Sequence, residues 1–281
     1  MVRRSVLFSP GDRPELMRKA PNTGADTVIF DLEDAVAPQR KEEARDAVRE
    51  VLSDPGFDPD CEVCVRVNPP EQGMEADVAA ISGDDCRLDA LMLPKATGGR
   101  DVRILDGAFP GETPPVLALV ESAAGVLGAA DIAAAEPTAA LVFGAEDLSA
   151  DIGATRTSEG TEVLYAREKV VVAAAAHDKA AIDTVYTDIE DTDGLAAETR
   201  FAIQLGYDGK MAIHPAQVDP INDAFTPDDE RIEWAQRILE AKEAADAEGR
   251  GVFRVDGEMV DAPLIAQAQR VVERARAAGK I

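Results

Sequence analysis

Carboxylates stand directly after several short apolar runs of this 281-residue sequence. In LVFGAEDL an apolar run passes through one glycine and then reaches Glu146 and Asp147. Glu121 follows the run VLALV, and Glu33 and Asp34 come shortly after VIFD. A buried carboxylate is costly unless hydrogen-bond donors or a cation neutralise it. The pattern therefore indicates a site at which carboxylates gather around a cation.

A magnesium ion is the cation that best suits Glu121 and Asp147. Mg²⁺ takes oxygen ligands and keeps water or substrate oxygens in its octahedral shell, so few protein carboxylates are needed. Zinc fits poorly, because the chain has only two histidines and they are far apart in the sequence. Each carboxylate taken singly could instead cap a turn or form an ion pair. Their joint position at the ends of neighbouring strands favours the metal.

Two basic residues stand at the ends of other apolar runs. Arg66, in VCVRV, could pair with Glu33 or Asp34, or it could bind a substrate carboxylate, for which the guanidinium fork is well suited. The residues alone leave both roles open. Lys95, in LMLPKAT, could form a Schiff base only in an apolar pocket that lowers its pKa. The sequence shows no such pocket, which favours a salt-bridged or phosphate-binding lysine.

Eight β-strands alternating with helices would bring these residues together. Runs rich in Val, Ile and Leu occur at 5–9, 27–31, 63–67, 89–93, 116–120, 139–143, 182–186 and 209–213, and helical spacing is clearest at 38–52, 161–176 and 192–205. Because parallel strands need a crossover between them, the alternation predicts an α/β fold, a (β/α)8 TIM barrel over residues 1–225. An open doubly wound sheet is the alternative, which the lack of a G-x-G-x-x-G motif after the first strand disfavours. The C-terminal ends of barrel strands form the active-site rim, and all the residues named above fall there.

Residues 226–281 are predicted to form a C-terminal helical extension with a hairpin between its two helices. The segment 226–249 has the start and stop signals of a helix. Asp256 and Gly257, between two short apolar arms, are typical of a two-residue hairpin turn. The barrel does not need this segment to close, so we expect it to cap a barrel face or to pack on a neighbouring subunit.

The charge of the chain disfavours two classes of partner. It has 54 acidic and 29 basic residues, a net charge of −25. Nucleic acid and membranes with anionic lipids would repel such a surface, because Lys and Arg supply most of the affinity for both. A lysine-poor acidic surface indicates a halophilic protein, whose self-repulsion is screened by salt, with a merely acidic cytosolic protein as the alternative. No apolar stretch reaches membrane-spanning length and the N-terminal one is too short for a secretory signal, so we expect a cytoplasmic protein.

Eight motifs follow one another along the chain. They are RRSVLFSPGDRPEL, VIFDLEDAV, VCVRVNP, LMLPKA, ALVESAAGV, LVFGAEDLSADIG, GKMAIHPAQV and GEMVDAP. This series, from about Arg3 to Val272, resembles the citrate lyase β-subunit-like family, which includes malyl-CoA and citramalyl-CoA lyases. The resemblance implies a Mg²⁺-dependent (β/α)8 barrel that acts on a 3-hydroxyacyl-CoA carrying a carboxylate. We expect a homotrimer or homohexamer.

The resemblance also implies roles for individual residues. Glu121 and Asp147 match the family's two magnesium ligands. Arg66 matches the arginine that grips the 2-oxo acid. Glu33 and Asp34 match the acidic pair after the second strand, and with Arg66 they are the catalytic candidates in the barrel.

Further candidates bind the substrate or move a proton. The backbone amides of Ala145 and Glu146 would hold the carboxylate of the oxo acid, and Lys95 is grouped with these substrate-binding residues. Asp261, in MVDAP, matches a catalytic aspartate that the family often delivers from the adjacent subunit. The residues alone would favour a helix N-cap at this position.

The implied reaction is a reversible retro-Claisen cleavage. A thioester such as malyl-CoA, citramalyl-CoA or citryl-CoA would give an acyl-CoA and a 2-oxo acid. Mg²⁺ would polarise the oxygen that becomes the carbonyl, and Asp261 would exchange a proton with the enolate. The alternatives are a malyl-CoA thioesterase that releases malate, and a lyase subunit that works only in a complex with an acyl-carrier protein. A non-catalytic protein is disfavoured by the intact carboxylate pair.

Overall fold

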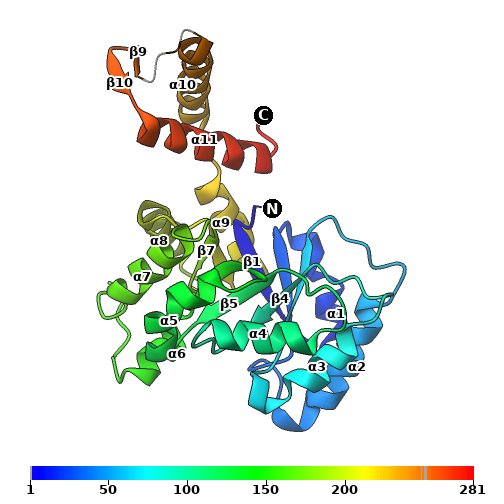
Figure 1. Cartoon of the computed structure of the whole chain (residues 1–281). Coiled ribbons are helices and arrows are strands. Elements are labelled where there is room, and N and C mark those ends of the chain that lie inside the picture. The colour runs from blue at the N-terminus through cyan, green and yellow to red at the C-terminus, as the bar shows by residue number, and fades with distance from the viewer. Residues whose placement is uncertain (1, 248, 250–251) are drawn as a thin grey trace. The chain divides into compact units, whose positions relative to one another are not determined.

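Eight parallel strands close into a barrel in the computed structural model, which describes residues 2–247, 249 and 252–281 (Figure 1). The strands pair in chain order, and the eighth returns to pair with the first. Their bounds are β1 (Ser5–Pro10), β2 (Thr27–Asp31), β3 (Glu62–Arg66), β4 (Ala90–Leu93), β5 (Val116–Val120), β6 (Thr138–Phe143), β7 (Ala180–Asp183) and β8 (Gly209–Ala212). The predicted (β/α)8 barrel is confirmed.

Helices connect the strands and cover the outside of the barrel, as Figure 1 shows. They are α1 (Pro14–Met17), α2 (Lys41–Leu52), α3 (Met74–Ile81), α4 (Gly99–Ala108), α5 (Ala123–Ala134), α6 (Ala145–Asp151), α7 (Leu164–Ala175) and α8 (Thr192–Leu205). A further helix, α9 (Val218–Phe225), follows β8. Short 3₁₀ turns lie at Ala20–Thr23, Pro38–Arg40, Pro70–Gln72 and Pro215–Gln217. Among the residues that the structure describes, no helix is both long and apolar enough to cross a bilayer.

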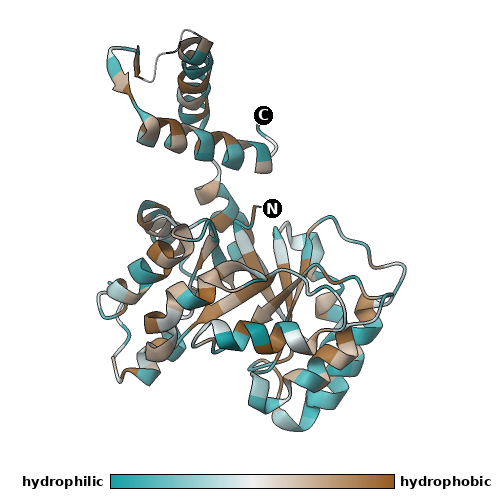
Figure 2. Cartoon of the chain, in the orientation of Figure 1, coloured by the Kyte–Doolittle hydropathy of each residue, from teal (hydrophilic) through white to brown (hydrophobic). Residues whose placement is uncertain are grey.

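The strands are apolar on both faces, as parallel strands covered by helices usually are. In Figure 2 they are mostly brown, whereas the helices carry both brown and teal segments. Residues such as Val6, Cys64, Leu117 and Val142 point into the barrel and form one buried cluster. Their chain neighbours pack outward against the helices, among them Val63, which is fully buried.

Gly209 shows how closely β8 approaches the start of β1. A Cβ atom at this position would lie only 1.8 Å from the main-chain oxygen of Arg3. No side chain fits in that space, so the glycine allows the last strand to pair with the first and the barrel to close.

The seventh strand lies earlier in the chain than its apolar pattern predicts. The sequence indicates a strand at 182–186, but the paired residues are Ala180–Asp183. Thr184 and Val185 follow the strand and line the cavity described below. Their β-branched side chains resemble a strand in sequence, whereas pairing with β6 and β8 ends before them.

A buried ion cluster joins β7 and β8 to α7. Arg167 donates two hydrogen bonds to Asp183, of 2.8 and 2.6 Å, and the ammonium of Lys210 lies 2.8 Å from the same carboxylate. Asp183 and Lys210 are fully buried. Burial alone would raise the pKa of Asp183, but Lys210 and Arg167 outweigh it and hold the pKa below its ordinary value.

The chain divides into two compact units near residue 221. The second unit, Asn222–Ile281, contains α10 (Asp229–Ala247), β9 (Phe253–Val255), β10 (Glu258–Val260) and α11 (Ala262–Ala277). The strands β9 and β10 form an antiparallel hairpin, and Asp256 and Gly257 at its turn both have positive φ angles, as the predicted turn requires. Phe253, Val260 and Val272 belong to a separate buried cluster within this unit.

Candidate active site

The strand ends enclose a cavity of about 300 Å³ at the C-terminal rim of the barrel. Five of the predicted site residues lie on its wall, namely Arg66, Glu121, Ala145, Glu146 and Asp147. Much of the remaining wall is apolar and is formed by Phe8, Leu119, Val185, Met211 and Ile213. The structure therefore brings Arg66, Glu121 and Asp147 to one cavity, whereas the predicted residues Glu33, Asp34 and Lys95 are not among those that line it.

Glu121 and Asp147 are in hydrogen-bonding contact with one another. Burial and this contact raise the pKa of Glu121 to about 8, although a main-chain N–H of Lys95 opposes the shift. Gly144 makes the approach possible, because a Cβ atom there would lie 2.6 Å from the Cβ of Glu121. The single glycine between the apolar run and the acidic pair thus allows the end of β6 to pass close to Glu121.

The donor set suits a magnesium ion. Two carboxyl groups pressed together repel when both are ionised, and a dication between them removes that repulsion. Within the described part of the chain, no cluster of three or more His, Cys, Asp or Glu side chains is placed to hold a metal. Mg²⁺ needs few protein ligands, because it completes its shell with water and substrate oxygens. Glu121 and Asp147 are therefore the residues that would hold it.

Arg66 is fixed by two carboxylates. Its Nε and Nη2 atoms donate to the two oxygens of Asp31, at 2.7 and 2.6 Å, and Nη1 lies 3.0 Å from Glu33. Its guanidinium also lies over the ring of Phe8, 4.9 Å from the centroid. Burial disfavours the charge, but the hydrogen bonds and the attraction of Asp31 raise the pKa of Arg66 above its ordinary value. The guanidinium is therefore a permanent, oriented cation on the cavity wall.

Asp31 is a partner that the sequence interpretation missed. The predicted partners of Arg66 were Glu33 and Asp34, and the structure pairs it with Glu33 but not with Asp34. Asp34 is more than half exposed, and its carboxylate lies 3.9 Å from the ammonium of Lys95. The sequence signal for Asp31 was only that Asp31 and Arg66 lie at the ends of consecutive predicted strands, whereas the structure shows that they are direct register partners.

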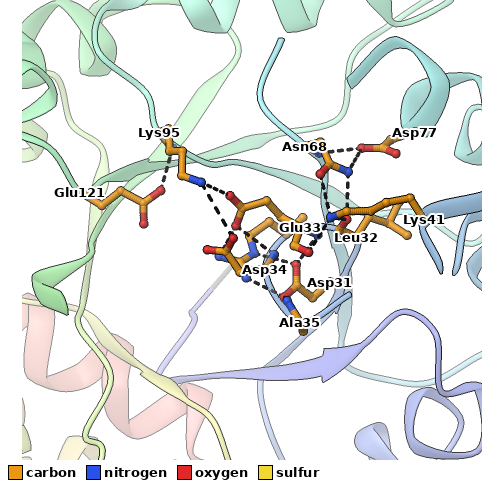
Figure 3. Close-up of polar contacts among 11 residues, drawn as sticks. Asp31, Leu32, Glu33, Asp34, Ala35, Lys41, Asn68, Asp77, Lys95 and Glu121 are labelled. Carbon is orange, nitrogen blue, oxygen red and sulfur yellow. Dashed lines mark hydrogen bonds and ion pairs between the residues drawn. The ribbon is translucent and has the colours of Figure 1, made fainter. Parts of the chain in front are cut away.

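Lys95 connects the acidic residues of two strands (Figure 3). Its ammonium lies 2.5 Å from Glu33, and its main-chain N–H donates to Glu121 at 2.8 Å. Burial favours the neutral amine, but Glu33 outweighs it and raises the pKa of Lys95 above its ordinary value. Burial also raises the pKa of Glu33, against the opposing effects of Arg66 and Lys95. A charged, paired lysine is not a Schiff-base nucleophile, in agreement with the salt-bridged role predicted from sequence.

Lys41 holds the loop that carries Glu33, and the sequence interpretation did not single it out. Its ammonium contacts the main-chain oxygens of Leu32 and Glu33, both at 2.6 Å, and the side-chain oxygen of Asn68 at 2.9 Å (Figure 3). As the first residue of α2, Lys41 looks in sequence like an ordinary surface position of an amphipathic helix.

The main-chain N–H of Ala145, one of the predicted donors of the site, has a partner within the chain. The N–H of Ala145 donates to the hydroxyl of Thr184 at 3.1 Å, and the side chain of Glu146 pairs with Arg156 at 2.9 Å. A substrate carboxylate at Ala145 would have to share or replace the Thr184 hydroxyl. The role of these amides stays a prediction.

Asp261 lies in the second unit, at the N-cap of α11. Its carboxylate accepts a hydrogen bond from the main-chain N–H of Leu264 at 3.3 Å. This is the capping role that the residues alone would favour. A cap of this kind leaves the second carboxylate oxygen available, and the catalytic role of Asp261 stays a prediction.

Converging carboxylates and a fixed arginine at the C-terminal rim of a (β/α)8 barrel are typical of a metal-dependent barrel enzyme. Residues 4–215 match the HpcH/HpaI aldolase/citrate lyase family, and the chain belongs to this family. The predicted enzyme class, a lyase, is thereby confirmed.

Named relatives cover nearly the whole chain. A mitochondrial citramalyl-CoA lyase of Mus musculus is 37% identical over 96% of this chain and 85% of its own length. The citrate lyase subunit beta of Escherichia coli K12 is 37% identical over 99% of this chain and 95% of its own.

Solved structures of Mycobacterium tuberculosis proteins share the fold. CitE in complex with magnesium, acetoacetate and coenzyme A has a TM-score of 0.80 at 37% identity, over 98% of both chains. A citrate lyase beta subunit complexed with oxaloacetate and magnesium has a TM-score of 0.70 at 37% identity, over 80% of this chain and 98% of the other. Magnesium, the cation predicted for this chain, is thus present in both structures.

Proposed function

We propose that this protein is a Mg²⁺-dependent carbon–carbon lyase. It cleaves, reversibly, a 3-hydroxyacyl-CoA that carries a carboxylate on the hydroxyl-bearing carbon, and it releases an acyl-CoA and a 2-oxo acid. The observation that carries the proposal is the contact between Glu121 and Asp147 on the wall of a cavity that also contains Arg66. The relatives named as citramalyl-CoA lyase and citrate lyase subunit beta support it.

Different residues of the barrel are proposed to bind the metal and the substrate carboxylate. Glu121 and Asp147 would hold the metal, which would supply polarisation of the substrate oxygen that becomes the carbonyl. Arg66, held by Asp31 and Glu33, presents its charge to the substrate carboxylate without having to reorganise. The main-chain N–H of Ala145, which donates to the hydroxyl of Thr184 in the structure, is a second donor for that carboxylate.

Cleavage transfers the proton of the substrate hydroxyl to a base in the cavity, and Asp261 is the proposed donor of a proton to the enolate of the departing acyl-CoA, or the acceptor of that proton in the reverse direction. We propose that the second unit packs on a neighbouring subunit of a homotrimer or homohexamer and delivers Asp261 to that subunit's barrel. Mixing subunits tests this. Asp147→Asn and Asp261→Asn proteins, each impaired alone, would regain activity in mixed oligomers if one subunit supplies the metal site and the other supplies Asp261. Mixtures with no gain would contradict delivery across the interface.

The substituent on the oxo acid is expected to be small and uncharged. Among the described residues that line the cavity, Arg66 is the one with a cationic side chain, and it is assigned to the carboxylate next to the substrate hydroxyl. A second substrate carboxylate would meet acidic residues or the apolar wall of Phe8, Leu119 and Met211. This favours malyl-CoA or citramalyl-CoA, which give glyoxylate or pyruvate, over citryl-CoA, which gives oxaloacetate.

Product analysis with the three thioesters tests the function. The purified protein with Mg²⁺ should release pyruvate from citramalyl-CoA or glyoxylate from malyl-CoA, and little oxaloacetate from citryl-CoA. Release of malate and free CoA would identify a thioesterase instead. Turnover only after addition of an acyl-carrier-protein partner would identify a complex subunit, the alternative that the citrate lyase beta relatives raise. Asp147→Asn is the matched negative control.

A further inference from the structure

Lys95 has an unusual backbone conformation for its residue type. Its φ angle is +53°, in the left-handed region that side chains other than Gly, Asn and Asp rarely adopt. Among the residues that the structure describes, Asp178 and Asp256 are the other non-glycine residues with positive φ. Both are aspartates in turns, where this conformation is tolerated. A lysine held there at the edge of the candidate site is an outlier, and such strain persists where the surroundings require it.

The left-handed conformation places two groups of Lys95 on two different carboxylates. The main-chain N–H points to Glu121, and the side chain extends the other way to Glu33, which in turn contacts Arg66 (Figure 3). The next residue is fixed as well, because the N–H of Ala96 donates to the main-chain oxygen of Leu119 on β5 at 3.1 Å. Lys95 therefore links Glu121, the proposed metal ligand, to Glu33, the partner of Arg66.

We propose that Lys95 is a positioning residue whose left-handed backbone aims its N–H at Glu121 and so fixes the carboxylate that binds the metal. Its ammonium separately holds Glu33 against Arg66. This inference rests on the proposed function, because it assumes that Glu121 is a metal ligand. The backbone and side-chain roles are separable, since one depends on which residues tolerate positive φ and the other on the charge.

Three substitutions of Lys95 separate the two roles. All three remove the positive charge. Lys95→Met keeps an unbranched side chain, whereas Lys95→Val adds β-branching that disfavours positive φ. Lys95→Gly accepts positive φ freely. The first measurement is the Kd of Mg²⁺, by calorimetry in the absence of substrate. We expect the Lys95→Met and Lys95→Gly proteins to bind Mg²⁺ as tightly as the wild type or more tightly, because a nearby cation has been removed. Val should weaken binding roughly tenfold to a hundredfold, the usual effect of losing a hydrogen bond to a charged group.

The second measurement is the Kd of pyruvate at saturating Mg²⁺. All three variants should bind pyruvate more weakly, because Glu33 loses its anchor and no longer holds Nη1 of Arg66 in place, although Asp31 still holds Nε and Nη2. Asp178→Val is the matched control. It places the same β-branched residue at the same φ region in an exposed turn, so it should lower the Tm and leave the Kd of Mg²⁺ unchanged.

Several results would overturn the inference. If all three Lys95 variants bound Mg²⁺ equally more weakly, the effect would belong to the lost ammonium and not to the backbone. If none of them bound Mg²⁺ more weakly, Lys95 would have no positioning role. Weakening by Asp178→Val would show that general destabilisation is the cause. Failure of the wild-type protein to bind Mg²⁺ or Mn²⁺ at all would contradict the proposed function itself, and with it the role of Lys95.

Discussion

Lowering the pH should weaken magnesium binding, because the metal competes with a proton for Glu121. The pKa of Glu121 in the metal-free protein is raised to about 8, first by burial and then by the contact with Asp147. Mg²⁺ needs the ionised carboxylate, so the apparent affinity should rise with pH and level off above the pKa. Competition by one proton at this pKa weakens the apparent affinity roughly 25-fold between about pH 8.5 and about pH 6.5.

Calorimetry in buffers of different ionisation enthalpy measures both the affinity and the protons released. Close to one proton per ion should leave the protein at about pH 6.5, and few at about pH 8.5. The stabilisation that Mg²⁺ gives in a thermal unfolding experiment should accordingly be larger at the higher pH. Glu121→Gln should bind Mg²⁺ weakly and without this pH dependence. Glu146 lies on the same cavity wall but is exposed and paired with Arg156, so Glu146→Gln should retain the pH dependence of Mg²⁺ binding.

A flat affinity profile over this range in the wild-type protein would refute the reasoning. It would mean that Glu121 is already ionised in the metal-free protein, or that it does not bind the metal. Proton release that persists in Glu121→Gln would assign the titration to another group.

Four further changes have expected outcomes. Asp147→Asn should abolish Mg²⁺-dependent turnover while the circular dichroism spectrum and Tm stay close to those of the wild type, and full activity in excess EDTA would contradict the metal assignment. Gly144→Ala should weaken Mg²⁺ binding about tenfold or more in calorimetry, because the added Cβ displaces Glu121. Asp261→Asn should slow carbon–carbon cleavage in a steady-state assay and spare the Kd of Mg²⁺, and wild-type rates would leave it with its capping role alone. Asp183→Asn should lower the free energy of unfolding in urea by roughly 3 kcal/mol or more at neutral pH, because two buried cations lose their shared partner. In the wild-type protein the pKa of Asp183 is lower in the folded state than in the unfolded state, so its carboxylate stabilises the fold at neutral pH. This stabilisation is lost as the pH falls through the folded-state pKa, so the stability difference between wild type and Asp183→Asn should shrink in acid.

The barrel could be predicted because its main signals are local in sequence. Each strand is a short apolar run, each return needs a helix, and the residue after each run must then lie at the same rim. This is why the sequence alone could place Glu121, Asp147 and Arg66 together. The seventh strand shows the limit, since Thr184 and Val185 have strand-like side chains but follow the strand, where pairing with the neighbouring strands has ended.

The network around the site could be predicted only in part. The pairing of Asp31 with Arg66 depends on the register of two strands, which an apolar pattern does not state. The contacts of Lys41 depend on where α2 begins relative to the second strand exit, and the conformation of Lys95 leaves no trace in its residue type. Side-chain identity indicated which chemistry was available, whereas the partners of each group depended on three-dimensional packing.

The adaptation to high salt, the cytoplasmic location and the oligomeric state stay predictions. Adaptation to salt can be measured by unfolding in increasing KCl, where screening should raise the Tm of a chain with a net charge of −25. A Tm that does not change, or that falls, would favour the merely acidic alternative.

The central claim is that Glu121 and Asp147 bind one divalent cation that also holds the substrate. The most direct test is an anomalous difference map from a crystal soaked with Mn²⁺ and pyruvate. The account predicts a single strong peak between the two carboxylates, at about 2 Å from an oxygen of each and of pyruvate. A peak bound elsewhere, or by only one of the two residues, would contradict it.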